Sequence, residues 1–536
     1  MENEYKIVSK DKLINIFAII AIISATFFAT TIALPAPDLW WQLSVGRYFH
    51  ETGKILQENI FSYTSFNTPV IDHEWLAEIL FYKLYLLGGL DLLYLLKSSI
   101  LSVIFSLLYI LIRKKYSPII CSASCILAIF TANFQLFSDV RPYLFTYLFF
   151  AITILSSEIL FEKDSKYTFC LIPIVWLWAN LHAGYMLFFA IALIYLFAKI
   201  LEEEYSNFKL KAKLLSINKQ KDIFIKTILE HKNLIITSII SFGLIFINPF
   251  GAKLALYPFS FSFSNDQFFK EHLTDWSVPD FLGQNLTFTI YLIFIWIGIL
   301  IYRKRLSIFN FLMLIAFSYL ACSAVRHITL FAILSPIYTS IIISDLDKII
   351  NKIKDNYNVI AIFLTMIIFL FLASFRASNL NGEKMTLETE LFPKYGVEFI
   401  KANKFKGNIS HPYGWGGYLI WKLYPANPKE YRVFIDGRAT VAYNEDIYRK
   451  ALMIDFGSKY YEQYLNEYNV NLVLCSKYFS KYRTDGKNLC ERLFENQNWY
   501  CLIETPTEFI FIRNNKENKE IIEKSKKGLL EYPELR

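Results

Sequence analysis

The amino-acid sequence predicts an α-helical polytopic membrane protein with a C-terminal soluble α/β domain. Three observations lead to this fold class: long apolar runs, basic residues concentrated in alternate loops, and a change to short strand-like runs after residue 375. The 536 residues are 54% hydrophobic and 18% aromatic, with a mean hydropathy of +0.34. Soluble globular proteins do not carry so many apolar residues in long runs. Much of the net charge of +8 lies in loops between these runs, so no nucleic-acid partner is expected.

About eleven apolar runs are interpreted as spans. The first, Ile14 to Leu34, is full length and lacks a small-residue cleavage site, so we expect it to remain in the membrane. The run 168–181 is short, and we expect it to form a broken pair with the next run, hinged at His182. The expected spans are 13–34, 91–112, 117–136, 140–160, 168–181, 184–201, 233–250, 285–302, 307–323, 327–344 and 357–375.

Basic residues indicate the orientation. When eleven spans are counted, five basic segments fall on one side of the membrane, and the positive-inside rule makes that side cytoplasmic. The N-terminus is then expected inside and the region after 375 outside. The segments contain Lys6, Lys10 and Lys12; Arg113, Lys114 and Lys115; the lysines from Lys209 to Lys232; Arg303, Lys304 and Arg305; and Lys348, Lys352 and Lys354.

Two domains are expected. Residues 1–375 form the transmembrane domain, with a long first outer loop over 35–75. Residues 376–536 alternate strand-like runs, at 432–435 and 471–475, with a helix-like stretch at 446–468, which is typical of an α/β domain. Cys475, Cys490 and Cys501 lie in this part, and no CxxC or Cys/His metal spacing appears.

Asp38 is the leading candidate for catalysis because it directly follows the first apolar run. It is also a good N-cap for an amphipathic helix over 39–52, which Gly53 would end at its C′ position. Trp40 and Trp41 suit a helix that lies in the membrane interface. A capping role and a catalytic role both fit this pattern, and one residue can have both.

The same loop ends in Asp72-His73-Glu74-Trp75. His73 and Glu74 together suit the binding of a divalent cation or of substrate. The alternative is a capped helix start, in which Asp72 caps and Glu74 occupies the first turn of a helix over 75–87.

Four further candidates stand at the outer ends of expected spans. Arg141 suits a lipid phosphate, and the alternative is that it reaches the headgroups by snorkelling. His182 lies between two apolar runs, and a polar residue at membrane depth usually faces a cavity. The alternative is a histidine whose hydrogen bonds are satisfied locally at a helix break. Arg326 and His327 are adjacent and suit an anion, again with snorkelling as the alternative. The loop segment that begins at Asp275 is a weaker candidate for substrate contact.

All of these residues fall on the outer side under a topology derived from Lys and Arg alone. Cationic groups near an anionic lipid carrier, together with an acid that accepts a proton, are what phosphate-linked group transfer needs. In the C-terminal part, Asp436 and Arg438 flank Gly437 at a strand end, and Gly416 and Gly417 indicate a turn or a close backbone approach. Asp436 and Arg438 would project towards an acceptor, or they would bond to each other or cap the loop.

Several segments resemble the GT-C superfamily of membrane glycosyltransferases, and more specifically a broad set of bacterial GT-C-like proteins. The resemblance runs from about residue 14 to 512. Its segments are Pro37-Asp38-Leu39-Trp40-Trp41, Asp72-His73-Glu74-Trp75-Leu76, Trp178-Ala179-Asn180-Leu181-His182, Arg326-His327, Gly416-Gly417-Tyr418-Leu419 and Phe434-Ile435-Asp436-Gly437-Arg438. Relatives in this superfamily include oligosaccharyltransferases, protein O-mannosyltransferases and lipid A aminoarabinose transferases.

The resemblance implies a glycosyltransferase in the cytoplasmic (inner) membrane of a bacterium, part of the cell envelope machinery. Its donor would be a sugar on a polyprenyl phosphate, its surroundings membrane lipids, and its acceptor a glycan, lipid or protein. Asp38 matches the acid that acts as base or helps to bind a metal. No second acid stands beside it, which departs from well-known members and favours direct base chemistry over a cation such as Mg or Mn. Glu74 or Asp72 would supply a second acid by position.

Two other functions share some of these features. An O-antigen ligase or polymerase uses outer Arg and His residues without needing Asp38 as a base. A transporter or flippase would place charges near the bilayer midplane and show repeated halves. Neither feature is apparent in the sequence, whose polar residues gather at span ends. A scaffold without enzymatic activity is the remaining alternative.

Overall fold

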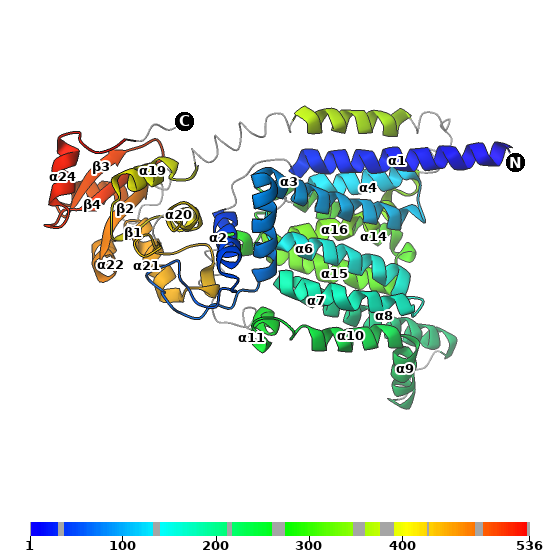
Figure 1. The fold of residues 1–536 in the computed structure, drawn as a ribbon. Helices are drawn as coiled ribbons and strands as arrows, with labels where there is room; N and C mark the ends of the chain where they lie inside the picture. The colour runs from blue at the N-terminus through cyan, green and yellow to red at the C-terminus, as the bar shows by residue number, and fades with distance from the viewer. Residues whose placement is uncertain are drawn as a thin grey trace. The chain divides into compact units, whose positions relative to one another are not determined.

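The computed structural model describes residues 2–30, 37–131, 140–211, 217–259, 274–346, 360–375, 391–425, 428–477 and 486–532 (Figure 1). The chain divides into two compact units. The first takes residues 1–32 and 90–380, and the second takes 33–89 and 381–536. The outer loop expected over 35–75 therefore shares a unit with the C-terminal region. Lys348, Lys352, Lys354 and residues 376–390, next to the expected domain boundary, lie outside the described residues.

The first unit is helical. Each expected span contains a helix, and six helices in the described part are long and apolar enough to cross a membrane. A further helix covers 360–375. The labelled helices are α1 (Glu2–Thr30), the second part of α3 (Trp75–Arg113), α4 (Pro118–Thr131), α6 (Tyr143–Ser156), α7 (Leu171–Leu181), α8 (Met186–Lys211), α9 (Ile217–Glu230), α10 (Lys232–Leu244), α11 (Ala252–Ala255), α14 (Leu286–Tyr302), α15 (Ile308–Ser323) and α16 (Ile328–Ile343), with the short helices η1 (Ser157–Phe161), η2 (Lys166–Cys170), η3 (Ala183–Tyr185), η4 (Thr274–Trp276), η5 (Arg303–Arg305) and η6 (Val325–His327).

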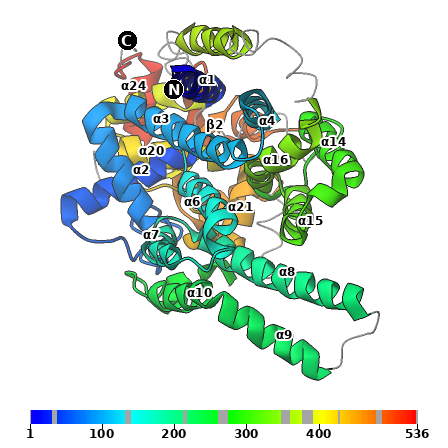
Figure 2. The ribbon, with the colours of Figure 1, turned by 90° about the vertical axis from the view of Figure 1, so that its right-hand side faces the viewer.

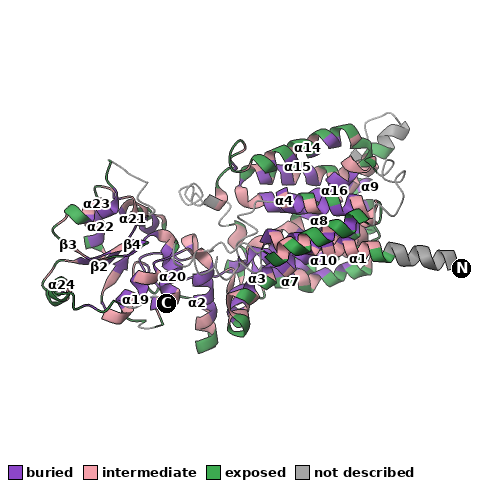
Figure 3. Cartoon of the chain, turned by 90° about the horizontal axis from the view of Figure 1, so that it is seen from above, coloured by how far each residue is buried: buried purple, intermediate pink, exposed green. Residues whose placement is uncertain are grey.

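Helix α16 forms the centre of this unit. It packs against α4, α6, α14 and α15 (Figure 2), and it is buried over nearly its whole length (Figure 3). Large apolar side chains point outward from the surrounding helices. Leu193 on α8 is 68% exposed and Leu300 on α14 is 64% exposed. Exposing such apolar side chains is favourable in lipid and unfavourable in water.

The expected break at His182 is present. Helix α7 ends at Leu181, His182 takes an extended conformation with φ −167° and ψ 148°, and η3 then leads into α8. A Cβ on Gly184 would lie 2.2 Å from the hydroxyl oxygen of Thr146. The bare glycine therefore lets the break pack directly against α6.

The second unit combines helices with one sheet. Its four strands have the order β1-β2-β4-β3, in which β1 pairs with β2 in parallel and the other neighbours pair antiparallel. The register sets Ile409 opposite Leu472 and Val473 opposite Phe511. The elements are α2 (Pro37–Thr52), the first part of α3, α19 (Lys394–Asn403), β1 (Asn408–Ser410), η7 (Tyr413–Trp415), α20 (Gly416–Leu423), η8 (Ala439–Val441), α21 (Glu445–Asp455), α22 (Tyr461–Glu467), β2 (Val470–Ser476), α23 (Leu489–Glu495), β3 (Trp499–Glu504), β4 (Glu508–Arg513) and α24 (Lys519–Lys526).

Helix α3 consists of two helical parts that meet at a kink. Gly88 (φ −157°, ψ 22°) and Gly89 (φ 61°, ψ −152°) interrupt it. The positive φ of Gly89 is a conformation that other residues rarely adopt. The glycine pair therefore separates the helix expected over 75–87 from the span expected over 91–112.

Two expected elements of the C-terminal region are wrong in detail. The helix over 446–468 is two helices, α21 and α22, because Gly457 between them has φ +63°. The strand over 432–435 is reduced to bridges at Val433, which pairs in parallel with Ser62 and with Ile409. Val433 thus joins the first loop to the edge of the sheet, and this pairing with a distant segment leaves no sequence signal.

A disulfide joins Cys475 at the end of β2 to Cys490 in α23. The two residues are 15 apart in sequence, and their Cα atoms are 5.8 Å apart. The bridge closes the segment between β2 and α23 into a loop. Cys501, the third cysteine of this unit, is free.

Candidate active site

Asp38 lies in the first turn of α2, which begins at Pro37. The expectation that Asp38 is the N-cap of a helix over 39–52 is therefore wrong by about two residues, because proline is well suited to the first helical position. A carboxylate in the first turn is still favoured by the positive end of the helix dipole. At the other end, Gly53 has φ +68° and its N–H donates to the carbonyl of Phe49, as expected for the C′ residue.

The aromatic face of α2 is covered by protein. Trp40 and Trp41 are each 7% exposed, so the expected position of this face in the membrane interface is wrong for these residues. The Trp40 ring contacts the rings of Phe392, Tyr418 and Trp421. Aromatic side chains serve equally well at an interface and in a packed core, and here α20 provides the core.

The carboxylate of Asp38 lies against Gly437. A Cβ built on Gly437 would stand 2.1 Å from Asp38 Oδ1 and 2.8 Å from Trp41 Nε1. The leading sequence candidate therefore meets the Asp436-Gly437-Arg438 motif directly. Sequence alone did not predict this contact, because the residues are far apart in the chain.

Tyr413 is an electrostatic neighbour of Asp38. Burial raises the pKa of the Tyr413 phenol well above its ordinary value, and the negative charge of Asp38 raises it further. Tyr413 therefore keeps its proton at neutral pH. Its ring also meets the ring of Tyr448 edge-on, with 5.0 Å between centroids.

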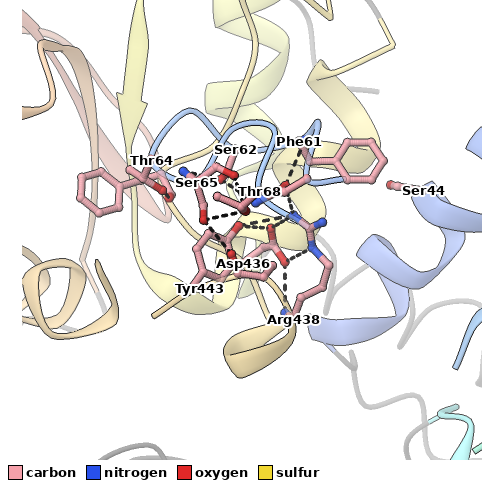
Figure 4. A network of polar contacts seen from close by, with 12 residues as sticks. Ser44, Phe61, Ser62, Thr64, Ser65, Thr68, Asp436, Arg438 and Tyr443 are labelled. Carbon is pink, nitrogen blue, oxygen red and sulfur yellow. Dashed lines mark hydrogen bonds and ion pairs between the residues drawn. The ribbon is translucent and has the colours of Figure 1, made fainter. Parts of the chain in front are cut away.

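Asp436 and Arg438 bond to each other, so the second alternative for this pair is the one observed (Figure 4). Arg438 Nε donates to Asp436 Oδ1 at 2.8 Å, and Nη2 donates to Oδ2 at 2.6 Å. Nη2 also donates to Asn59 Oδ1 at 2.9 Å, and the Tyr443 hydroxyl donates to Asp436. The two charged residues are 0% and 3% exposed.

Electrostatics stabilise this pair in its ionised form. Burial opposes the charge on Asp436, but the Arg438 guanidinium and its hydrogen bonds outweigh burial and lower the pKa of the carboxyl. Burial raises the pKa of Tyr443, and the Asp436 charge raises it further. The network is therefore an ion pair with a neutral phenol donor, and it uses most of its hydrogen-bonding capacity internally.

The Asp72-His73-Glu74 segment directly precedes α3, which begins at Trp75, so the expectation that Glu74 occupies the first helical turn is wrong by one residue. Asp72 is 5% exposed and its Oδ1 accepts from the N–H of Glu74 at 2.9 Å. Glu74 accepts from Gln42 of α2 at 3.1 Å and lies 3.7 Å from His73 Nε2. Burial raises the pKa of Asp72, while the Arg438 charge acts in the opposite direction. Glu74 thus ties α3 to α2, and Asp72 lies within the field of Arg438.

The sequence patterns did not point to Glu78. It is fully buried, and its carboxyl group shares a side-chain hydrogen bond with the carboxyl group of Asp72. The charges of Asp72 and Arg438 act on it. Its spacing of four residues from Glu74, which places both on one helix face, is the signal that could have identified it.

In the first unit, Arg141 and Arg326 are held by the segment 274–277. Arg141 Nη1 pairs with Asp275 Oδ2 at 2.7 Å. The guanidinium of Arg326 lies 4.4 Å from the ring centre of Trp276. Both arginines and Asp275 act electrostatically on Tyr147 of α6. The two cationic candidates therefore gather near the N-terminal end of α6.

His327 and His182 make mainly local contacts. His327 Nδ1 bonds to the carbonyl of Leu320 at 3.1 Å, and its ring meets Trp276 edge-on. His182 is 8% exposed, and its Nδ1 lies 2.8 Å from the hydroxyl of Thr146 and accepts from the N–H of Gly184. The Nδ1 of His182 is therefore satisfied, as the helix-break alternative expects.

No three His, Cys, Asp or Glu side chains in the described part of the chain gather in a way that could hold a metal ion. Asp38 packs on a glycine and an indole, and Asp436 is paired with arginine.

Comparison with solved structures finds a similar fold. One match is the crystal structure of the Archaeoglobus fulgidus oligosaccharyltransferase in the apo form. The match covers 95% of this chain and 75% of the oligosaccharyltransferase chain, with a TM-score of 0.53 and 12% sequence identity. The chain therefore has a fold similar to that of this oligosaccharyltransferase. Comparison with models of protein families and with curated proteins finds no match.

Proposed function

We propose that this protein is a membrane glycosyltransferase of the GT-C type. It would act on the extracytoplasmic face and use a sugar carried on a polyprenyl phosphate or diphosphate. The observation that supports this most is the position of Asp38, in the first turn of the helix that follows the first span, within a fold similar to that of an oligosaccharyltransferase. The disulfide supports the extracytoplasmic placement of the second unit, since such bonds persist in oxidising compartments.

The proposed reaction is an in-line displacement. An acceptor oxygen or nitrogen attacks the anomeric carbon, the bond from that carbon to the phosphate oxygen breaks, and the configuration inverts. Asp38 takes the proton from the acceptor as general base. Arg141 and Arg326 neutralise the charge that develops on the departing phosphate, and His182 and His327 contribute hydrogen bonds to it. His73 and Glu74, at the end of the first loop, help to bind the substrate. No step of the mechanism uses a metal ion.

The test is Asp38→Asn, which keeps the size of the side chain and removes the base. The purified protein in lipid nanodiscs is given a panel of radiolabelled polyprenyl-phosphate and polyprenyl-diphosphate sugars with cell-envelope extract as acceptor. Release of the polyprenyl carrier is measured. General-base loss predicts a rate lower by about 100-fold or more.

The matched control is Asp446→Asn. Asp446 also stands in the first turn of a helix in the second unit, where it is 64% exposed and pairs with Lys450. The Asp446→Asn substitution should leave the rate of carrier release unchanged. Near-full transfer by Asp38→Asn would remove the catalytic role and leave Asp38 as a residue that stabilises a helix start.

A further inference from the structure

We propose that Gly437 is a positioning residue for Asp38, and that the Asp436–Arg438 ion pair acts on the reaction by holding Gly437 in place. This inference rests on the proposed role of Asp38. It assigns Asp436 and Arg438 a function different from acceptor binding. The glycine would act by the absence of a side chain, since that absence leaves the space that the Asp38 carboxylate occupies.

The requirement for glycine at position 437 is steric. A Cβ there would stand 2.1 Å from Asp38 Oδ1 and 3.2 Å from Asp38 Cγ. The φ angle of Gly437 lies outside the left-handed range that disfavours other residues. Alanine could therefore adopt this backbone, and the cost of a methyl group would arise from the carboxylate and the Trp41 indole.

The backbone of Gly437 is fixed by its neighbours in sequence. Besides the side-chain ion pair, the N–H of Arg438 donates to Asp436 Oδ1 at 3.0 Å, which closes a tight turn around Gly437. Arg438 also bonds to Asn59, as described above. Because both side chains are buried and bonded to each other, they are poorly placed to bind an acceptor and well placed to fix the turn.

The first loop holds the same segment from outside. The Val433 N–H donates to the carbonyl of Phe61 at 2.9 Å, and the Tyr63 N–H donates back to Val433 at 3.2 Å. The Ser65 hydroxyl donates to the carbonyl of Ala442 at 2.8 Å. Residues 61–65 are therefore hydrogen-bonded to the chain before and after the Gly437 turn.

Two further glycines allow close packing around Asp38 and Gly437. A Cβ on Gly416 would stand 2.0 Å from the Ile435 carbonyl oxygen, and one on Gly417 would stand 2.7 Å from the Pro37 carbonyl oxygen. The start of α20 is therefore packed between the beginning of α2 and the segment that precedes Gly437. These contacts fix the distance between Asp38 and the Gly437 turn.

The first experiment is kinetic and compares Gly437→Ala with Gly414→Ala. Gly414 lies in the same unit, and a Cβ there meets nothing within 4 Å. The donor is the polyprenyl-linked sugar of the panel that the native protein consumes fastest. Because a displacement of about 1 Å at a reacting group can cost about 100-fold, Gly437→Ala should lower kcat by that order and change KM less than threefold. Gly414→Ala should match the native protein.

The second experiment keeps the inference testable if Gly437→Ala folds poorly. Thermal unfolding is measured for the native protein, Gly437→Ala, Asp38→Ala and the double variant, which form a double-mutant cycle. The methyl group and the carboxylate compete for one space, so the fall in Tm caused by Gly437→Ala should be at least halved in the Asp38→Ala background. Equal falls in both backgrounds would overturn the inference.

Outcomes separate the two proposals. If Asp38→Asn is inactive but Gly437→Ala keeps native kcat, the positioning inference fails and the proposed function stands. If Asp38→Asn is fully active, the proposed function fails, and with it the role of Gly437 in the reaction. A change in Tm for Gly437→Ala with unchanged kcat would show a merely structural glycine and would also overturn the inference.

Discussion

The guanidinium of Arg438 donates a hydrogen bond of 2.9 Å to the side chain of Asn59, although 379 residues separate the two in sequence. This bond joins the first loop to the C-terminal region inside the second unit. It belongs to a buried network with Asp436 and Tyr443. The stability of that unit should therefore depend on groups contributed by two distant parts of the chain.

Arg438→Met and Asp436→Asn should each destabilise the protein by about 3–5 kcal/mol, because each leaves a buried charge or its partners unsatisfied. Protein yield, thermal unfolding and sugar transfer are measured together, and all three should fall in step. Arg449→Met is the control, since Arg449 pairs with Glu445 on the surface at 45% and 42% exposure and such pairs contribute at most about 1 kcal/mol. Normal yield with a raised KM for the acceptor and an unchanged kcat would instead assign Asp436 and Arg438 to the acceptor.

Arg326→Met should lower the rate of donor consumption by about 100-fold, because it removes a charge that faces the departing phosphate in the proposed reaction. Arg305→Met provides a closely matched control. Arg305 also lies over an aromatic ring, that of Tyr302, and pairs with Asp345, yet the proposed topology places it on the cytoplasmic side. Equal rates for the two variants would remove Arg326 from the phosphate site.

The Cys475–Cys490 bridge and the C-terminus should both be extracytoplasmic. A reporter active only in the cytoplasm, fused after residue 536, should be silent. In intact cells, a membrane-impermeant maleimide should label Cys475 and Cys490 only after reduction. Cytoplasmic reporter activity would contradict the eleven-span count, and labelling of Cys475 or Cys490 without reduction would contradict the bridge.

Stability should depend on pH through Asp455 of α21. Burial raises the pKa of Asp455 to about 7. An acid whose pKa is raised on folding binds a proton more tightly in the native state, so stability falls as pH rises from about 4 to above 7. Asp455→Asn should therefore raise Tm at pH 8 by about 2–4 °C for each kcal/mol relieved, and leave it unchanged at pH 4. A gain at pH 4 equal to that at pH 8 would contradict this origin.

The spans and the break at His182 could be predicted from sequence because apolar length and helix interruption are local properties. The Gly53 C′ position and the separation of 75–87 from the following span were predictable for the same reason. The start of α2 was misplaced because Pro37 and Asp38 both fit a helix start, and the choice depends on geometry. Trp40 and Trp41 were assigned to the membrane interface because sequence does not show that α20 covers them.

The candidate site was predictable as a set of residues, but its contacts were not. The meeting of Asp38 with Gly437 and of Arg141 with Asp275 depends on pairing between distant segments. Glu78 was overlooked because its sequence signal, a spacing of four residues from Glu74, belongs to no catalytic motif. The alternatives for Asp436 and Arg438 could be separated only when both side chains were seen to be buried.

The division of the second unit between residues 33–89 and 381–536 also has a consequence for biosynthesis. Asn59 leaves the ribosome 379 residues before Arg438, which corresponds to roughly 20–75 seconds at about 5–20 residues per second. During that interval the spans of the first unit are being inserted, and the first loop has no C-terminal region to fold against. Maturation of this unit is therefore post-insertional, and a chain arrested before α20 would present the aromatic face of α2 to the bilayer surface or to chaperones.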